Sequence, residues 1–384
     1  MRWLKIVLIV VCLLLPMTAM ATESIEKVDE VSQSEIQTEL LEQFDFSDID
    51  SLMEEMFPEH KMSFFDLVTG LISGEMEFSF DLIKEFVWQQ FTYELENSRT
   101  SMIHIVLIVL VGAIFANFSG VFQSTQVSEI SFTMLYMLLI TICLNNFRIL
   151  VQVAAGNLQK LMEFMTLLGP IYFLAVGIAT GSSTSIAFYQ LILLLVFLAE
   201  LLILNFLLPL TQIYLIMRIL GEFSSDVPLT KFSEFLETVV SWTLKTLVAG
   251  VVGLNVVQGL LNPAIDSVKR SLITKGGEAL PIIGDVIGGA TEIVLGTAVL
   301  IKNGIGVAGM IICLIVCLAP ILQMALTALL YQLLSALVQP ISDKRMVNCI
   351  SGMANSTKLL LKILVTIGVL FMLTIAVVAT TAGG

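Results

Sequence analysis

The sequence predicts an all-α fold: a polytopic helical membrane protein with an acidic, extracytoplasmic helical segment near its N-terminus. Hydrophobic residues make up 57% of the 384 residues, and the mean hydropathy is +0.95. Charged residues make up only 13%, about half of the roughly 25% that soluble domains carry. Several apolar runs after residue 101 are long enough to cross a bilayer as helices.

The negative charge of the chain is confined to one segment. The net charge is -13, but residues 22–101 alone carry 20 acidic and four basic side chains. The rest of the chain carries 12 acidic and 15 basic side chains. Because binding to a nucleic-acid backbone needs clustered Lys and Arg, this distribution predicts no nucleic-acid partner.

The residues that common enzyme and metal sites need are missing. With two histidines in different segments, His60 and His104, the chain has no H-E-x-x-H zinc motif, and it has no G-x-x-x-x-G-K-[ST] phosphate loop. Gly284-Asp285 matches half of an intramembrane aspartyl protease motif, but no second aspartate lies in a late apolar run. Four cysteines lie in or beside apolar runs, which is typical of packing residues. We therefore predict no catalytic residues, no cofactor and no metal.

Residues 1–21 have the pattern of a secretory signal peptide. Arg2 and Lys5 precede a short apolar run, and Ala19-Met20-Ala21 forms a small-residue cleavage site. Cleavage there would place the new N-terminus on the outer side of the membrane. An uncleaved anchor is the alternative.

Residues 22–101 form the acidic extracytoplasmic segment. Polar residues dominate as far as about Gln43, and large apolar residues then return at helical spacing between Phe44 and Asn97. This pattern predicts two or three amphipathic helices. They pack either on the protein's own membrane part or on partner proteins, and an acidic surface disfavours adsorption to anionic lipid.

The membrane part divides into residues 102–220 with about four spans, a polar connector at 221–237, and a second helix group at 238–384. The apolar runs from which the spans are drawn are 102–122, 130–145, 161–180, 186–208, 238–261, 282–301, 304–318, 321–338 and 359–380, and not all of them need to cross. Leu210–Leu220 is too short to cross alone and predicts a kinked continuation or a re-entrant piece. Residues 281–304 form a glycine-rich broken or re-entrant segment. We count seven or eight crossings, depending on the course of Ile282–Ile301.

Positive charge suggests an orientation for these spans. If residue 22 is outside and five crossings follow, the connector that carries Lys269, Arg270 and Lys275 lies inside, as cytoplasmic loops prefer. The side on which the C-terminus lies depends on whether Ile282–Ile301 crosses.

Glu200 is the most unusual single residue of the apolar runs. A carboxylate inside a membrane helix is costly unless it is protonated, paired or facing a wet cavity. Glu200 is therefore either a proton or substrate site or a hydrogen-bonded residue that holds helices together.

A second group of polar residues lies in the glycine-rich stretch. Asp285 and Glu292 are seven residues apart and share a face if the segment is helical. Lys302-Asn303-Gly304 interrupts the apolar run that follows. A broken helix exposes backbone groups that can hold an ion, as in transporters. A helix-hairpin turn at the membrane boundary is the alternative.

The same stretch carries a family resemblance together with three others. These strings are Asn262-Pro263 with Asp266, Ser267 and Lys269; Pro281 to Asp285; Ile301-Lys302-Asn303-Gly304-Ile305-Gly306-Val307; and Gln339 to Asp343-Lys344-Arg345. With the order of signal peptide, acidic segment and many spans, the chain resembles the stage III sporulation protein AE family of endospore-forming bacteria. None of these strings is a chemical motif, and their specificity comes from their occurrence in this order.

This resemblance implies a non-enzymatic membrane component of the channel-like complex between mother cell and forespore, which is needed for late forespore development. We expect a multi-pass protein in the mother-cell membrane that surrounds the forespore, with its N-terminal segment in the intermembrane space. Its expected partners are the lipid bilayer and other membrane proteins of the complex, and a homo-oligomer stays open. The alternative function is a secondary transporter with a broken-helix site near Asp285, Glu292 and Lys302.

Overall fold

The structure is a computed structural model that describes residues 40–41, 43–56, 63–74, 80–117, 125–180, 185–223, 229, 231–253 and 284–381. The predicted signal peptide and the predicted connector at 262–275 lie outside these ranges. All regular structure in the described residues is helical, so the all-α prediction is confirmed.

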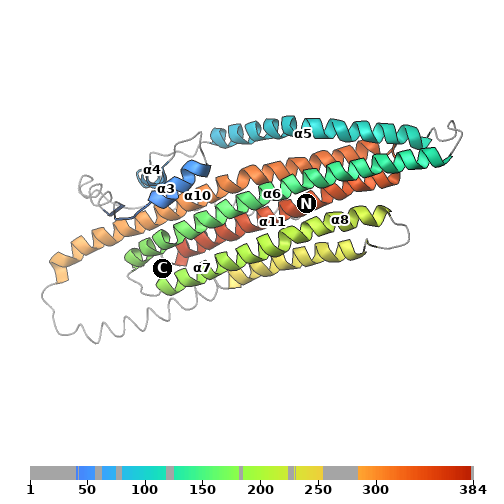
Figure 1. Cartoon of the computed structure of the whole chain (residues 1–384). Helices are drawn as coiled ribbons and strands as arrows, with labels where there is room; N and C mark the ends of the chain where they lie inside the picture. The colour runs from blue at the N-terminus through green and yellow to red at the C-terminus, as the bar shows by residue number, and fades with distance from the viewer. Residues whose placement is uncertain are drawn as a thin grey trace.

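Long helices lie side by side along one common axis (Figure 1). α10 packs against α4, α5, α6 and α11, most extensively against α11, and we call it the central helix. α6 also has many neighbours, since it contacts α3, α5, α7, α8, α10 and α11. A further helix spans Lys231–Gly253. The labelled helices are α3 (Ser47–Met56), α4 (Phe64–Ile72), α5 (Phe80–Asn117), α6 (Thr125–Thr180), α7 (Ser185–Leu202), α8 (Leu208–Phe223), α10 (Gly284–Val338) and α11 (Lys344–Thr381), with the π-helix η2 (Ile203–Leu207) between α7 and α8.

Within the described ranges, six helices are long and apolar enough to cross a membrane. This confirms a multi-pass character, while the number of crossings, seven or eight over the whole chain, stays a prediction. Two sets of predicted spans are in fact single helices. The spans 130–145 and 161–180 both belong to α6, and the spans 304–318 and 321–338 both belong to α10.

Proline and polar residues do not end these two helices. Pro170 lies inside α6 and Pro320 inside α10. A proline removes one backbone hydrogen bond, which is a local cost, whereas a new turn in an apolar environment would leave several backbone groups without partners. With 56 residues, α6 is about 84 Å long at about 1.5 Å per residue. That is more than twice the hydrocarbon thickness of about 30 Å.

The predicted helix break at Lys302-Asn303-Gly304 is wrong as well. α10 continues through these residues without interruption, so neither a broken helix nor a re-entrant turn is formed there. The glycines are explained by packing instead, since neighbouring helices lie directly against Gly304 and Gly306. Glycine in a helix interior is tolerated where it permits such close contact.

Leu210–Leu220 continues the preceding span. Of the two predictions for this segment, a kinked continuation and a re-entrant piece, the structure shows the continuation. α7 passes through η2 directly into α8, and Pro209 lies in the first turn after the π-helix. A π-helix inserts one extra residue per turn, and such insertions are common next to prolines and other local disturbances.

The acidic segment packs on the protein itself. α3 contacts α6, and α4 contacts α10. At the start of α3, the Ser47 hydroxyl and amide both donate to Asp45, which holds the pKa of that exposed carboxyl below its ordinary value. An ion pair of 3.4 Å between Glu55 and Lys160 joins α3 to α6. The predicted boundary at residue 102 falls inside α5, which therefore connects the acidic segment to the membrane part without a break.

Asp50 joins α3 to α4 and provides a test of this docking. Its carboxylate accepts hydrogen bonds from the Ser63 hydroxyl and the Phe64 amide at the first turn of α4. We expect Asp50→Ala to cost about 1 kcal/mol, as for loss of a helix cap, and to speed cleavage within residues 40–74 by an added protease. Asp48→Ala, an exposed change on the same helix, is the control. Equal cleavage rates for both variants would contradict this role.

The order of helices changes the orientation argument. Four candidate membrane helices precede residue 254, whereas the orientation argument assumed five. An even number returns the chain to the side from which α5 starts. If each of these four helices crosses the membrane once, an outer position for the acidic segment would place the end of the Lys231–Gly253 helix on the outer side as well, so the predicted inner position of Lys269, Arg270 and Lys275 needs one further crossing.

Candidate functional site

Four side-chain hydrogen bonds join neighbouring helices at one level of the bundle. Three of them have a partner on α10, and these three partners lie within six residues of each other, which is about 8 Å along the helix. The fourth joins Lys362, one turn after Lys358 on α11, to Ser241. We call this set the polar layer; it comprises Glu94, Asn146, Ser241, Thr327, Tyr331, Gln332, Lys358 and Lys362.

On one side of α10, the polar layer is deeply buried. The Glu94 side chain on α5 is 2% exposed, and its Oε1 accepts from the Thr327 hydroxyl at 3.0 Å and from the Ser98 hydroxyl at 3.1 Å. On α6, the Asn146 amide donates to the hydroxyl of buried Tyr331 at 3.0 Å. These bonds fix α5 and α6 against the same two turns of α10.

On the other side, α11 contributes two lysines. Lys358 Nζ donates to Gln332 Oε1 on α10 at 2.6 Å. One turn later, Lys362 Nζ donates to Ser241 Oγ on the Lys231–Gly253 helix. Glu237 and Lys245 of that helix lie close enough to Lys362 to interact with it electrostatically. The polar layer thus continues across a fourth and a fifth helix.

This arrangement can fix helix register, but its chemistry does not resemble a catalytic centre. A polar side chain in an apolar bundle is strongly favoured to find a partner, so only one sliding position of neighbouring helices satisfies all four bonds. Within the described residues, no group of three His, Cys, Asp or Glu side chains could hold a metal ion.

The predicted residues of the glycine-rich stretch lie on different sides of α10. Lys302 is buried with 1% of its surface exposed, whereas the neighbouring Asn303 is exposed. Asp285 and Glu292 belong to α10, but their side chains lie outside the described set. Because α10 is continuous, the free backbone groups that a broken helix would expose at Lys302-Asn303-Gly304 are absent, and an ion site at Asp285 and Glu292 stays a prediction.

Gly304, Gly306 and Gly309 are instead positions of close contact on α10, and we call this set the glycine face; Gly304 lies against α4, whereas Gly306 and Gly309 lie against α6. A Cβ atom at Gly304 would lie 2.7 Å from the Ile72 side chain of α4. At Gly306 it would lie 2.8 Å from the Tyr172 hydroxyl oxygen, and at Gly309 2.6 Å from Leu168, both on α6. The glycine face is where α4 and α6 approach the central helix most closely.

The remaining predicted residues lie elsewhere. Glu200 is exposed on α7 and belongs neither to the polar layer nor to the glycine face. Asp343 and Arg345 lie together at the start of α11, where Asp343 Oδ1 accepts from the Arg345 amide at 2.8 Å. The Arg345 guanidinium carbon is 5.2 Å from the centre of the Phe132 ring, which joins α11 to α6. The predicted residues therefore occupy at least three separate places.

Several polar-layer residues were not singled out from the sequence. Glu94 was assigned to the acidic segment, yet it lies against the central helix. The spacing of polar residues in the sequence could have indicated other members of the polar layer. Ser241 recurs with Glu237 and Lys245 at every fourth residue, and Lys358 and Lys362 have the same spacing. Such spacing places polar residues on one helix face.

Comparison with known proteins supplies the family. A model of the stage III sporulation protein AE family matches residues 62–382. The chain belongs to this family. It is also similar to "Stage III sporulation protein AE" of Bacillus subtilis (strain 168), with 23% identity over 359 residues that cover 93% of this chain and 89% of the relative. No solved structure matches.

The resemblance inferred from the four sequence strings is thereby confirmed. The family match begins just before α4 and ends after α11, so it includes the glycine face and the polar layer. The sporulation family is therefore matched from α4 to α11 rather than through one short motif, and α3 lies before the matched residues.

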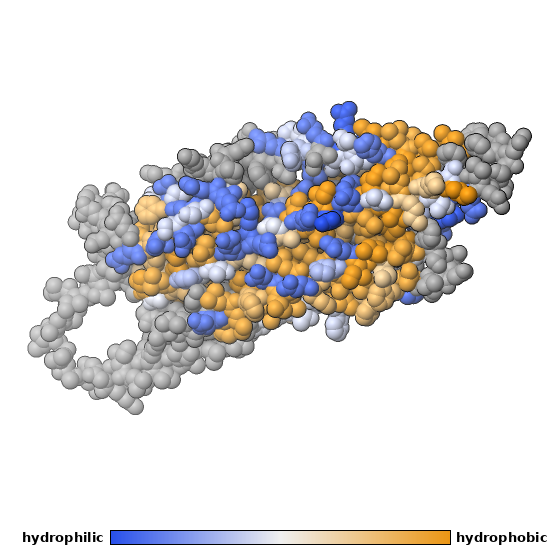
Figure 2. All heavy atoms as spheres, in the orientation of Figure 1, coloured by the Kyte–Doolittle hydropathy of each residue, from blue (hydrophilic) through white to orange (hydrophobic). Residues whose placement is uncertain are grey.

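The surface of this sporulation-family bundle is divided between apolar and polar regions. Figure 2 shows hydrophobic residues dominating the end where α5 approaches α6, while polar side chains gather over the middle and the other end. Exposed large apolar residues at that end come from several helices, and they include Ile103, Leu107, Met134, Leu333 and Leu337. Such a surface fits contact with lipid acyl chains.

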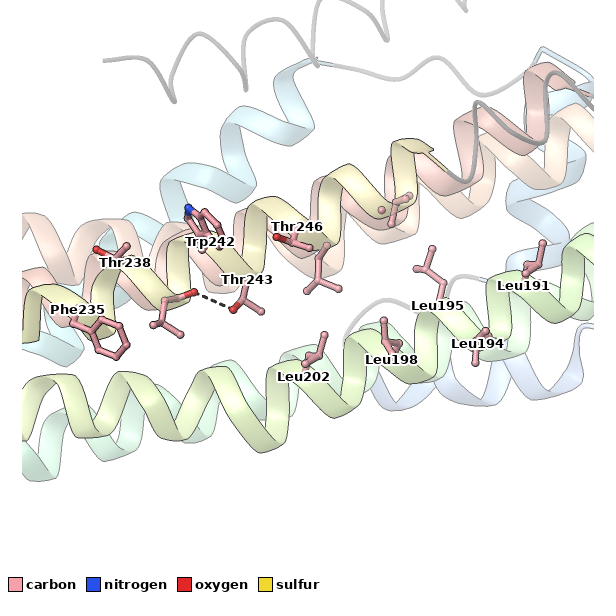
Figure 3. A pocket seen from close by; sticks show the side chains of 14 residues that line it. Leu191, Leu194, Leu195, Leu198, Leu202, Phe235, Thr238, Trp242, Thr243 and Thr246 are labelled. Carbon is pink, nitrogen blue, oxygen red and sulfur yellow. Dashed lines mark hydrogen bonds between the residues drawn. The ribbon is translucent and has the colours of Figure 1, made fainter. Parts of the chain in front are cut away.

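An apolar groove of about 780 Å³ lies between α7 and the Lys231–Gly253 helix. In Figure 3, Leu194, Leu198 and Leu202 of α7 face the side of the other helix that carries Phe235 and Thr243. The Thr243 hydroxyl in this groove donates to the Val239 carbonyl oxygen at 2.9 Å. The groove is lined mainly by hydrocarbon and offers no set of converging polar groups for a substrate.

Proposed function

We propose that this protein is a non-enzymatic membrane component of the channel complex that links mother cell and forespore and supports late forespore development. The observation that carries this proposal is the family match over residues 62–382, which covers the membrane bundle and α4. Helices joined by a register-fixing polar layer and a glycine face suit a rigid assembly subunit. Transport through a broken-helix site is not part of the proposal, because α10 is continuous.

The acidic surface of α3 supports a role in assembly. α3 buries its apolar side on the bundle and leaves Asp48, Glu54 and Glu55 exposed. In our proposal this face lies on the intermembrane side of the mother-cell membrane and binds basic surfaces of other membrane proteins of the complex. Charge complementarity of this kind favours specific partners and fast association.

Complementation of an endospore-forming strain that lacks its own family member tests both parts of the proposal. The acidic-face variant combines Asp48→Lys and Glu54→Lys, and the membrane-acid variants are Glu200→Gln, Asp285→Asn and Glu292→Gln. Heat-resistant spores, a late forespore reporter and the membrane level of each protein are measured. We expect at least tenfold fewer spores from the acidic-face variant at normal protein level, and near wild-type counts from the others.

The opposite pattern would overturn the proposal. If the acidic-face variant sporulates normally, α3 is not a required docking surface. If Glu200→Gln is present at normal level but blocks spore formation after engulfment, a charge-dependent pathway replaces the assembly role. A Lys231→Gln variant, which changes an exposed charge on another helix, controls for a general effect of surface charge.

A further inference from the structure

Three lysines from two neighbouring helices gather at the edge of the polar layer. Lys358 and Lys362 lie one turn apart on α11, and Lys245 lies on the Lys231–Gly253 helix. The bond from Lys362 to Ser241 holds the two helices together at this point. Lys245 lies one turn after Ser241, the partner of Lys362, so Lys362 has Lys358 one turn away on its own helix and Lys245 near it on the neighbouring helix. We call these three residues the lysine cluster.

Nearby side chains leave the lysine cluster with an excess of positive charge. Glu237 is an acidic neighbour that interacts with Lys362, and it also forms a hydrogen bond with Tyr214 of α8. Arg218 lies one turn from Tyr214 on α8 and adds a further positive charge on that side. The named groups therefore comprise four basic side chains and one carboxylate.

The lysine cluster is accessible from outside the bundle. Lys245 and Lys358 are exposed, and Lys362 is half-buried. The amide of Gln332 and the hydroxyl of Ser241 lie beside the lysines and add polar groups that can bond an anionic oxygen.

Exposed apolar side chains lie near the lysine cluster on the Lys231–Gly253 helix and follow its partner Gln332 on α10. Trp242, three residues from Lys245, is 71% exposed. On α10, Leu333 follows Gln332 directly and is 55% exposed, and Leu337 is 64% exposed one turn later. Tryptophan favours the boundary between headgroups and acyl chains. A basic cluster that borders an exposed apolar surface matches the two ends of a phospholipid.

We propose that the lysine cluster binds the phosphate of an anionic phospholipid whose acyl chains lie over Trp242 and Leu333. Ammonium groups attract phosphate as point charges, and basic pockets between membrane helices are known to hold anionic headgroups. Free inorganic phosphate shares this chemistry, but it does not use the apolar surface. The lipid is therefore the favoured source of the phosphate.

The full-length protein in detergent, titrated with defined lipids, tests this assignment. Native mass spectrometry counts bound phosphatidylglycerol, and phosphatidylcholine is the neutral comparison. The test variant combines Lys245→Gln, Lys358→Gln and Lys362→Gln, and the matched control combines Lys231→Gln with Lys344→Gln at exposed positions elsewhere. We expect roughly tenfold weaker retention of phosphatidylglycerol in the test variant and no change in the control.

Further arms separate the remaining outcomes. A triple Lys→Arg variant keeps the charge and should retain the lipid, which distinguishes lost binding from lost folding. Equal retention by the wild type and the Gln variant would overturn the proposal, as would equal retention of phosphatidylcholine. Displacement of phosphatidylglycerol by millimolar inorganic phosphate, with Trp242→Ala having no effect, would show that the cluster is a site for the free anion instead.

Discussion

Gly306→Ala is expected to destabilise the bundle by about 1–3 kcal/mol, which is the usual cost of overpacking a core. The new methyl group would lie 2.8 Å from the Tyr172 hydroxyl oxygen and 3.2 Å from two carbons of its ring. Tyr172 is 3% exposed, and its hydroxyl donates to the Ile375 carbonyl oxygen of α11 at 3.4 Å. The Tyr172 ring is therefore held in place and cannot move away from the new methyl group without losing these contacts. Thermal unfolding of the protein in detergent measures the effect.

Gly296→Ala is the matched control on the same helix. A Cβ atom at Gly296 would meet nothing within 4 Å, so alanine should stabilise the helix by about 0.5–1 kcal/mol through its higher helix propensity. The two alanine variants should therefore change the unfolding temperature in opposite directions. If both raise it, the close contact between α10 and α6 at Gly306 does not exist.

The second large effect is expected at Glu94. Glu94→Ala removes the acceptor for the Thr327 and Ser98 hydroxyls in a buried position. Leaving a buried polar group without its partner costs about 1–3 kcal/mol, and a cavity adds to that. We expect a lower unfolding temperature. We also expect faster proteolytic cleavage of α5, because its contact with α10 is weakened.

Glu94→Gln is the matched variant, because its amide oxygen can still accept from Thr327. We expect it to lose less than half of what Glu94→Ala loses. Combination with Thr327→Val completes a double-mutant cycle, in which the pair should show a coupling of about 0.5–3 kcal/mol. Additive effects of the two changes would mean that the Glu94–Thr327 bond does not stabilise the bundle.

The existence of membrane helices could be predicted from the sequence, but their continuity could not. Hydropathy identifies apolar runs, and a polar stretch such as residues 146–160 then looks like a loop. In the structure that stretch is helical, because Asn146 has a partner 185 residues away on α10 and Lys160 has one on α3. Partners so distant in sequence leave no local signal.

Dependence on partners distant in sequence also limited how well the candidate site could be predicted. Charged residues in apolar runs are easy to find, so Lys302 and Glu200 were singled out, yet the structure places one in the core and the other on the surface. Glycines were noticed, but their role depends on which helix lies opposite. Glu94 was missed because its acidic sequence neighbourhood indicates a solvated surface, whereas Thr327 accounts for its burial.

The π-helix η2 puts α7 and α8 out of phase by one residue. An α-helix turns by about 100° per residue, so the wider turn rotates everything that follows relative to an uninterrupted α-helix. Residues Tyr214, Leu215 and Ile219 are buried in the resulting arrangement. Deletion of a single residue within Ile203–Leu207 would restore the regular winding but swing this buried side toward the outside. The number of residues between α7 and α8 therefore constrains the packing of α8 as much as the hydrophobicity of its buried side chains does.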